Sequence, residues 1–372
     1  MDITRIRLIL LLITIFTWAQ TSFAYPGFSS RYWASAEILY WWTNDSTIPI
    51  PLATKNNIPG ALAIIGQPGT EIILGSGSSQ NSFDFDGMRG LRLTFGGWLD
   101  DTHCYGLEAS AFGLAPKTEK MLANPVVDVP FFSTTTGSEN VLVGGRVNNI
   151  TDENTLGPSS FEINMLYRIP RARIPLVVTA GFRYMNIDDK VVLIDSIFNT
   201  PSLPPGAALN VEDTFNARNH FYGLQLGART KTNYCNFVFE GKAQIAFGMN
   251  YQRLAIHGQT NVNNQTVLQP IGLFAEPTNS GTFTHEQFAM LPELQIKLGY
   301  NGINYLSPFI TWNLLYMNNV NRAAKQIDRN INQSQNPLLG GTGTLIGAPA
   351  PQKQFRQSSF WLQGISIGVS FG

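Results

Sequence analysis

The stretch Phe360-Trp-Leu-Gln-Gly-Ile-Ser-Ile-Gly-Val-Ser-Phe-Gly372 ends the chain and decides the fold. From Ile365 onward, apolar residues occupy every second position, and Ser366, Gly368 and Ser370 fill the positions between them. This alternation predicts a β-strand with one apolar face and one face of small polar residues. A half-buried strand of a soluble protein has this pattern, and so does a membrane strand with lipid on one face and a polar lumen on the other. We expect the membrane strand, because the segment is terminal and many others like it precede it.

Nine further segments alternate apolar with polar or glycine residues in the same way. They are Tyr32 to Trp42, Leu91 to Leu99, Tyr105 to Ala111, Phe161 to Arg168, Leu176 to Tyr184, Tyr222 to Arg229, Phe237 to Phe247, Met290 to Tyr300 and Leu306 to Tyr316. Two weaker candidates are Val191 to Phe198 and Tyr251 to Gln259. The sequence therefore predicts an all-β, antiparallel, up-and-down transmembrane β-barrel of about 12 strands, within a range of roughly 10–14.

The polar faces of these strands carry ionisable side chains. They are Glu37, Arg92, Glu108, Arg183, Arg229, Glu240, Lys242, Glu293 and Lys297. An Arg or Lys that faced lipid at the midplane would cost about 2–4 kcal/mol, so we predict that all nine line the lumen. Carboxylates and cations of neighbouring strands would pair there, which reduces the cost of burying them.

The N-terminus predicts export. Arg5 and Arg7 precede the apolar run from Leu8 to Trp18, and Ser22-Phe23-Ala24 provides small residues for cleavage. Residues 1–24 are therefore predicted to be a cleaved signal peptide and residues 25–372 a single barrel domain in the outer membrane. Charged residues make up 13% of the chain and the formal net charge is zero, so we expect no nucleic acid partner.

Long polar stretches connect the predicted strands. They are Asn44 to Asn81, Ala115 to Gly157, Thr200 to Leu209 and Asn330 to Gln352. Loops of this length are unusual in compact soluble domains and common at the outer mouth of a barrel. We predict long extracellular loops, of which at least one folds back to constrict the lumen.

Aromatic residues gather near strand ends and on the predicted outer face. They are Tyr32, Tyr40, Trp42, Tyr105, Tyr167, Tyr184, Tyr222, Tyr300, Trp312 and Tyr316. Such rings suit the membrane interface, which is apolar on one side and wet on the other. The alternative role, stacking on a ligand, applies best to Trp98 and then to Trp33 or Trp41.

Catalytic and metal-binding patterns are weak. The four histidines, at positions 103, 220, 257 and 285, lie in separate segments without metal-ligand spacing. Asp188-Asp189, or His220 with Asp213, are the best candidates for a barrel hydrolase, but neither matches a triad motif. We therefore predict no catalytic site, no metal and no cofactor. Cys104 and Cys235 could pair in an oxidising compartment, and the sequence leaves that open.

Several segments, in order along nearly the whole mature chain, resemble one family. They are residues 36–43, Pro51-Leu52, residues 66–70, Leu74-Gly75, residues 87–100, residues 180–184, residues 213–227, residues 277–281, Pro292-Glu293, residues 319–322, residues 326–329 and residues 360–364. Together they are similar to the outer-membrane β-barrel porins that are abundant in planctomycetes. The resemblance implies an outer-membrane barrel of porin type, and it brings no substrate or catalytic residue with it.

The predicted function is a passive channel for small hydrophilic solutes, with outer-membrane lipid and the barrel-assembly machinery as further partners. In that hypothesis the nine ionisable residues set the width and field of the pore. The alternative is a structural or surface-binding barrel in which they form a paired network that fills a closed lumen. A barrel hydrolase is the third hypothesis, and a soluble secreted β-sandwich is the competing fold.

Overall fold

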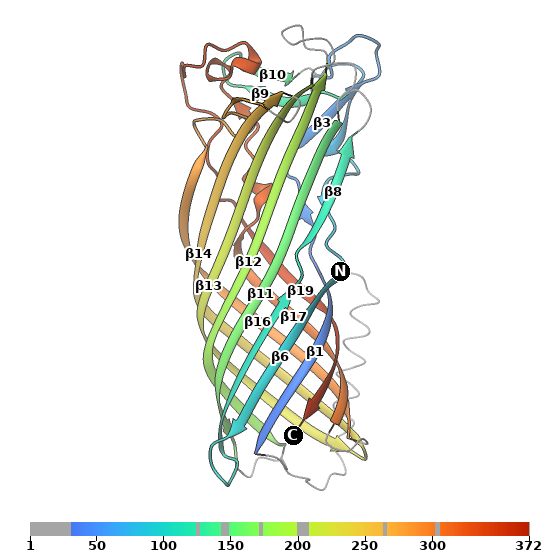
Figure 1. The fold of residues 1–372 in the computed structure, drawn as a ribbon, viewed down its shortest axis with the longest axis vertical. Helices are drawn as coiled ribbons and strands as arrows, with labels where there is room; N and C mark the ends of the chain where they lie inside the picture. Colours follow the sequence, from blue (N-terminus) through green and yellow to red (C-terminus); the bar gives the residue numbers. More distant parts are fainter. Residues whose placement is uncertain are drawn as a thin grey trace.

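The computed structural model describes residues 31–123, 127–142, 149–170, 174–198, 208–262, 266–301 and 306–371, so the predicted signal peptide lies outside it. Within these ranges ten long antiparallel strands form a closed cylinder (Figure 1). They are β1 (Tyr32–Thr43), β6 (Met88–Trp98), β7 (Tyr105–Leu114), β11 (Asn149–Arg168), β12 (Leu176–Phe198), β13 (Ala208–Tyr234), β14 (Phe237–Val262), β16 (Gly281–Tyr300), β17 (Leu306–Asn321) and β19 (Gln357–Phe371). The ring closes because β11 pairs with both β7 and β12, and β1 pairs with both β19 and β6.

Shorter elements fill the long connections. They are β2 (Ser46–Thr47), β3 (Pro51–Asn56), β4 (Thr70–Gly75), β5 (Ser82–Phe83), β8 (Lys117–Ala123), β9 (Val129–Ser133), β10 (Ser138–Leu142), β15 (Thr266–Gln269), β18 (Asn330–Ile331) and the 3₁₀ helices η2 (Ala323–Gln326), η3 (Gln333–Gln335) and η4 (Pro337–Leu339). No helix among the described residues is long and apolar enough to cross a membrane.

The prediction of an antiparallel barrel is confirmed, and each of the ten clear strand patterns falls in one strand of the ring. The ring contains ten strands within the described residues, at the lower end of the predicted range. The two weaker candidates, Val191 to Phe198 and Tyr251 to Gln259, are not separate strands. They are the outer parts of β12 and β14, which reach 23 and 26 residues.

The two ends of the cylinder differ in their connections. Strand β13 passes into β14 through only residues 235–236, whereas residues 44–87 connect β1 to β6. Barrels of this type place short turns in the periplasm and long loops outside the cell. The end that carries β3, β9 and β10 in Figure 1 is therefore the extracellular end.

Two belts of aromatic rings mark the edges of the lipid-facing surface. The outer belt includes Tyr184, Tyr222 and Tyr251, whose rings follow one another at centroid distances of 5.1 and 5.7 Å. The inner belt, near the short turns, includes the pairs Tyr105–Tyr167 at 5.3 Å and Phe237–Tyr300 at 5.5 Å. Amphipathic rings are favoured at both membrane interfaces, so the belts bound the membrane-spanning part.

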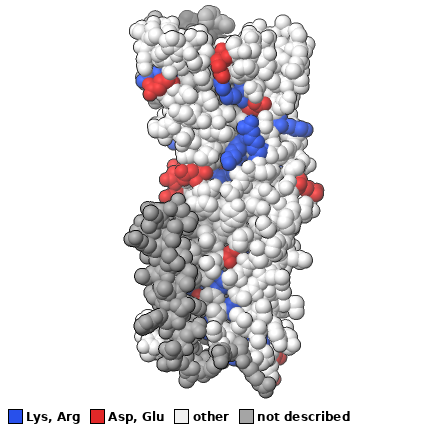
Figure 2. Space-filling model, turned by 180° about the vertical axis from the view of Figure 1, so that it is seen from behind, with Lys and Arg blue, Asp and Glu red and all other residues white. Residues whose placement is uncertain are grey.

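The distance between the belts fits a bilayer. Twelve residues separate Tyr222 from Tyr234 along β13, which gives about 30 Å of height for a tilted strand. On the face of the molecule seen in Figure 2, which is the back of Figure 1, the charged side chains lie mainly on the extracellular half. The strands continue well beyond the outer belt, so a large part of the barrel stands outside the membrane.

The apolar face of the strands changes sides at the outer belt. Below it on β13, Leu224 faces outward with 74% exposure while Gln225 is buried inside. Above it, the buried inward residues are Phe221 and Phe215, and the outward face carries the half-exposed Arg218. Lipid contacts the wall below the belt and water contacts it above, so the apolar side chains turn inward where the lipid ends.

The extracellular half of the barrel is filled by an apolar core. Inward residues of the strands, such as Phe215 and Phe221, pack there with residues that the outer loops contribute. The loop residues include Phe83, Phe85, Phe131, Phe274 and Ala323. As expected, outer loops fold back into the barrel, and several of them do so at once.

Candidate functional site

The nine ionisable residues predicted to line the lumen all lie on the inner face of the membrane-spanning part. Seven of the nine side chains are less than 12% exposed, and the other two, Glu240 and Lys297, reach only 17 and 23%. The alternation of each strand places them there, because the outward positions between them are apolar and face lipid.

One cluster of charges lies deep in the lumen. Glu293 on β16 accepts hydrogen bonds from Arg92 on β6 at 3.2 Å and from Arg183 on β12 at 2.6 Å. Arg92 also donates to the Asn313 side-chain oxygen at 2.7 Å. These strands come from different sides of the ring, so the ion pairs cross the lumen rather than follow the wall.

A second cluster lies nearer the periplasmic end. Glu108 accepts a hydrogen bond from Arg229 at 2.6 Å, and the Lys242 ammonium lies 3.8 Å from its other oxygen. Glu240 lies 3.9 Å from Arg229 and 4.0 Å from Lys297. These five residues form a continuous set of ion pairs.

Glu162 on β11 joins the two clusters. Its carboxylate accepts from Arg183 of the first cluster at 2.8 Å and from Lys242 of the second at 2.8 Å. Gln225 and Gln244 donate to the same carboxylate at 2.9 and 2.7 Å. The alternation placed Glu162 on the inner face but did not select it as a site residue. Its central position depends on which strands meet across the lumen, a relationship that no single strand pattern contains.

Glu37 joins the network indirectly. Its carboxylate accepts from the Ser366 hydroxyl at 2.6 Å, and the Asn313 amide donates to that hydroxyl at 3.1 Å. Asn313 in turn accepts from Arg92. The nine predicted residues and Glu162 thus form one connected polar network, which we call the lumen network.

The lumen network is balanced in charge and buried at its centre. It contains five carboxylates and five cations, so its formal charge is zero. Side-chain exposure falls from 23% at Lys297 to 2% at Arg183 and Glu293. Side chains of several strands therefore pack against one another at this level, with little solvent-accessible surface left on them.

The tryptophans considered for ligand stacking are packed among other side chains. Trp98 is buried with its ring centroid 5.6 Å from that of Trp33, and Trp33 donates to Glu108 at 3.0 Å. Trp41 is fully buried, with Phe112 at 5.0 Å and the Arg92 guanidinium over its ring at 5.1 Å. The three rings are therefore packed against other inward side chains.

The residues considered for hydrolysis do not come together. Asp213 is fully buried and accepts hydrogen bonds from the backbone amides of residues 273–275, whereas the His220 ring bonds to the Tyr184 hydroxyl at 3.0 Å. Seven residues of extended strand separate them, a distance of about 23 Å. Asp188 and Asp189 pair with Arg218 and Arg322 respectively.

Metal and disulfide chemistry find no support within the described residues. No group of three or more His, Cys, Asp or Glu side chains there could hold a metal ion. Cys104 and Cys235 are both free thiols, in the β6–β7 and β13–β14 turns.

A closed antiparallel cylinder with an apolar outer band between two aromatic belts defines an outer-membrane β-barrel. The chain belongs to the family described as "Putative beta barrel porin-7 (BBP7)", whose pattern matches residues 33–372. This confirms the resemblance that the sequence motifs indicated.

Among solved structures, the chain is similar to the crystal structure of the outer membrane protease OmpT from Escherichia coli. The two share 7% sequence identity with a TM-score of 0.44, over 94% of this chain and 98% of that chain. No curated protein matches the sequence.

Proposed function

We propose that this outer-membrane barrel has a closed lumen and acts as a structural or surface-binding barrel through its extracellular half. The observation that carries the proposal is the lumen network. Side chains from both sides of the ring meet at Arg183 and Glu293, which are only 2% exposed. A passive channel would need a continuous water path at this level.

The lumen network is one barrier to an ion, and the apolar core on its extracellular side is a second. The apolar core of the extracellular half contains large inward side chains, among them Phe215, Phe221 and Phe360, each fully buried. An ion that passed the lumen network would next meet this core, where an unpaired charge is strongly disfavoured. Opening the barrel would therefore require two unlike layers to rearrange.

The extracellular loops are tied to the barrel wall and to one another by polar contacts. Asp213 on β13 holds three consecutive backbone amides of the loop at residues 273–275, at 2.7–3.1 Å. Arg322 pairs with Asp189 on β12, and Arg329 pairs with Glu139 in β10, which belongs to another loop. Loops held in this way present a fixed surface to the outside, which suits binding or structural support.

The competing hypothesis is the passive channel for small hydrophilic solutes. The family description favours it, and so does the greater exposure of Lys297 and Glu240 toward the periplasmic mouth. Under this hypothesis the lumen network would have to move aside during conduction.

Single-channel recording separates the two hypotheses. The full chain, refolded in detergent and checked by heat-modifiable migration, is placed in a planar bilayer beside an open porin as the positive control. We expect insertion without stepwise current. A double variant, Glu108→Ala with Lys242→Ala, should also stay silent, because the apolar core remains. Stable stepwise conductance of the unaltered protein would overturn the closed-lumen proposal.

A further inference from the structure

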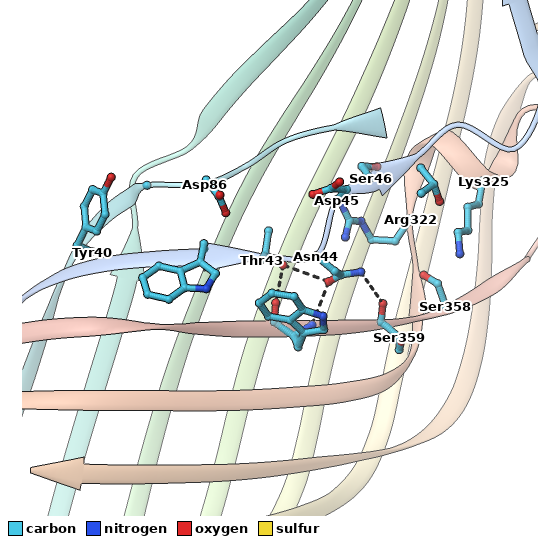
Figure 3. A pocket seen from close by; sticks show the side chains of 14 residues that line it. Tyr40, Thr43, Asn44, Asp45, Ser46, Asp86, Arg322, Lys325, Ser358 and Ser359 are labelled. Carbon is cyan, nitrogen blue, oxygen red and sulfur yellow. Dashed lines mark hydrogen bonds between the residues drawn. The ribbon is translucent and has the colours of Figure 1, made fainter. Parts of the chain in front are cut away.

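A pocket lies in the barrel wall at the level of the outer aromatic belt, between outward-facing aromatic rings and Arg322 on the inner side of the wall. It encloses about 640 Å³ and lies where β1 ends and β19 begins (Figure 3). Its membrane-side rim is formed by Tyr40, Trp42 and Trp361, which occupy outward positions of these strands. The pocket is therefore separate from the lumen network and faces the membrane interface.

Two cations line this pocket. Arg322 is 2% exposed and donates through Nε to Asp189, while its Nη2 is buried without a hydrogen-bond partner among the described residues. Lys325, one turn further in η2, is half-buried, and its ammonium makes no ion pair or hydrogen bond within the part of the chain that the structure describes. Burial, and then the nearby Arg322 guanidinium, lower the pKa of Lys325.

A buried hydroxyl adds to the unmet hydrogen-bonding capacity. Ser46 lines the same pocket and is 3% exposed, and its Oγ has no partner among the described residues. Buried polar atoms are nearly always hydrogen-bonded, so each such atom calls for an explanation. A guanidinium, an ammonium and a hydroxyl around one pocket are the donors that a phosphate group accepts.

Hydrogen bonds between the end of β1 and β19 hold the base of the pocket in place. The Asn44 side chain donates to the Ser359 carbonyl at 3.2 Å and accepts from the Trp361 backbone amide at 3.1 Å. The Thr43 hydroxyl donates to the Trp361 carbonyl at 2.5 Å. Figure 3 shows these bonds tying the end of β1 to β19, so the pocket is preformed by the barrel wall.

The surroundings indicate which phosphate compound fits. Below the aromatic rim, the outward residues Ile38 and Ile365 are 68 and 43% exposed, as expected for side chains in contact with lipid tails. Asp45 and Asp86 also line the pocket. Their carboxylates disfavour a bare polyanion and favour a phosphate whose headgroup also carries ammonium or hydroxyl donors.

We propose that this pocket binds the phosphorylated headgroup of a membrane lipid. Arg322, Lys325 and the Ser46 hydroxyl bind the phosphate, the tryptophan rim covers the interfacial part of the lipid, and the acyl chains lie along the band below. Asp45 and Asp86 accept hydrogen bonds from the ammonium or hydroxyl groups of the headgroup.

The test uses the full chain in detergent with added phosphatidylethanolamine, followed by native mass spectrometry. Diacylglycerol with the same acyl chains is the control that lacks the phosphate. We expect one retained phosphatidylethanolamine per barrel and much less diacylglycerol. Lys325→Met should weaken retention about tenfold, as the loss of one charge-assisted contact predicts. Lys353→Met, which removes a loop lysine outside the pocket, should leave retention unchanged.

Three outcomes would overturn the proposal. They are equal retention of both lipids, unchanged retention in Lys325→Met, and full competition by inorganic phosphate, which would identify a soluble anion as the ligand. Heat-modifiable migration reports whether each variant is folded. Quenching of Trp42 and Trp361 by phosphatidylethanolamine with brominated chains gives a second readout on the unaltered protein, and its absence would also count against the proposal.

Discussion

Arg183 holds the carboxylates of Glu162 and Glu293 with a single guanidinium nitrogen, at 2.8 and 2.6 Å. The two acids come from β11 and β16, which lie on different sides of the ring. Either carboxylate alone would leave a buried charge without adequate compensation, since each faces more than one cation of the lumen network. The stability of the membrane-spanning part should therefore depend strongly on Glu162.

Replacing Glu162 by Gln keeps the shape of the side chain and removes its charge. Arg183 and Lys242 then lose their shared partner in a buried site, and we expect unfolding to become easier by about 3–5 kcal/mol. Urea unfolding from lipid vesicles, followed by tryptophan fluorescence, measures the change.

Glu153→Gln is the matched control on the same strand. Glu153 pairs with Lys120 at the surface, where the Lys120 side chain is 57% exposed, so its loss should cost less than about 1 kcal/mol. Equal effects of the two substitutions would show that the lumen network contributes little to stability.

A charge placed on the outer wall should be tolerated only outside the membrane. Leu226 is 60% exposed, between the two aromatic belts, and Leu226→Arg should cost about 2–4 kcal/mol. His257, on the outward face of β14 beyond Tyr251, is exposed where water is expected. His257→Arg should change the free energy of unfolding by less than about 0.5 kcal/mol. The same vesicle assay compares them, and similar costs would place the membrane boundary elsewhere.

Alternation along the strands was sufficient to predict the barrel, its ten clear strands and the inner face of the membrane-spanning part. It was not sufficient to extend β12 to Phe198 or β14 to Val262. The apolar residues of β12 change faces between Tyr184 and Met185, so Val191 and Leu193 point inward although the apolar residues below the belt point outward. A pattern that assumes one solvent along the whole strand divides such a strand in two.

The lumen network was predictable residue by residue but not as an assembly. Each strand pattern placed its own charged side chain inside. The contact between Arg92 and Glu293 joins residues 201 positions apart, and the bond from Ser366 to Glu37 spans 329. Such pairs follow from ring closure and register. Whether the lumen is closed or open to solutes likewise depends on packing, which the alternation does not contain.

Cysteine labelling tests the orientation of the barrel. Cys235 is exposed in the short β13–β14 turn, and Ile346, in the long connection before β19, is 68% exposed. In intact cells, a maleimide too large to cross the outer membrane should label Ile346→Cys and leave the unaltered protein unlabelled. After permeabilisation, Cys235 should react as well, because its thiol is free. Labelling of Cys235 in intact cells would instead place the short turns outside.

The outer loops should be docked less firmly at high pH because of Glu276. Burial raises the pKa of this carboxyl to about 8, against the opposing hydrogen bonds from Asn336 and Gln335. Between the ordinary value of 4.5 and about 8, the docked loop binds more protons than the undocked one, so docking weakens as pH rises through this range.

Hydrogen exchange at the amides of residues 273–276 measures how firmly the loop is docked. The unaltered protein is compared with Glu276→Gln at each pH, and this comparison cancels the intrinsic pH dependence of exchange. We expect the protection of the unaltered protein to fall between pH 5 and 9 relative to the variant, with amides in the middle of β16 as the internal reference. Parallel profiles for the two proteins would mean that Glu276 does not control the docking of this loop.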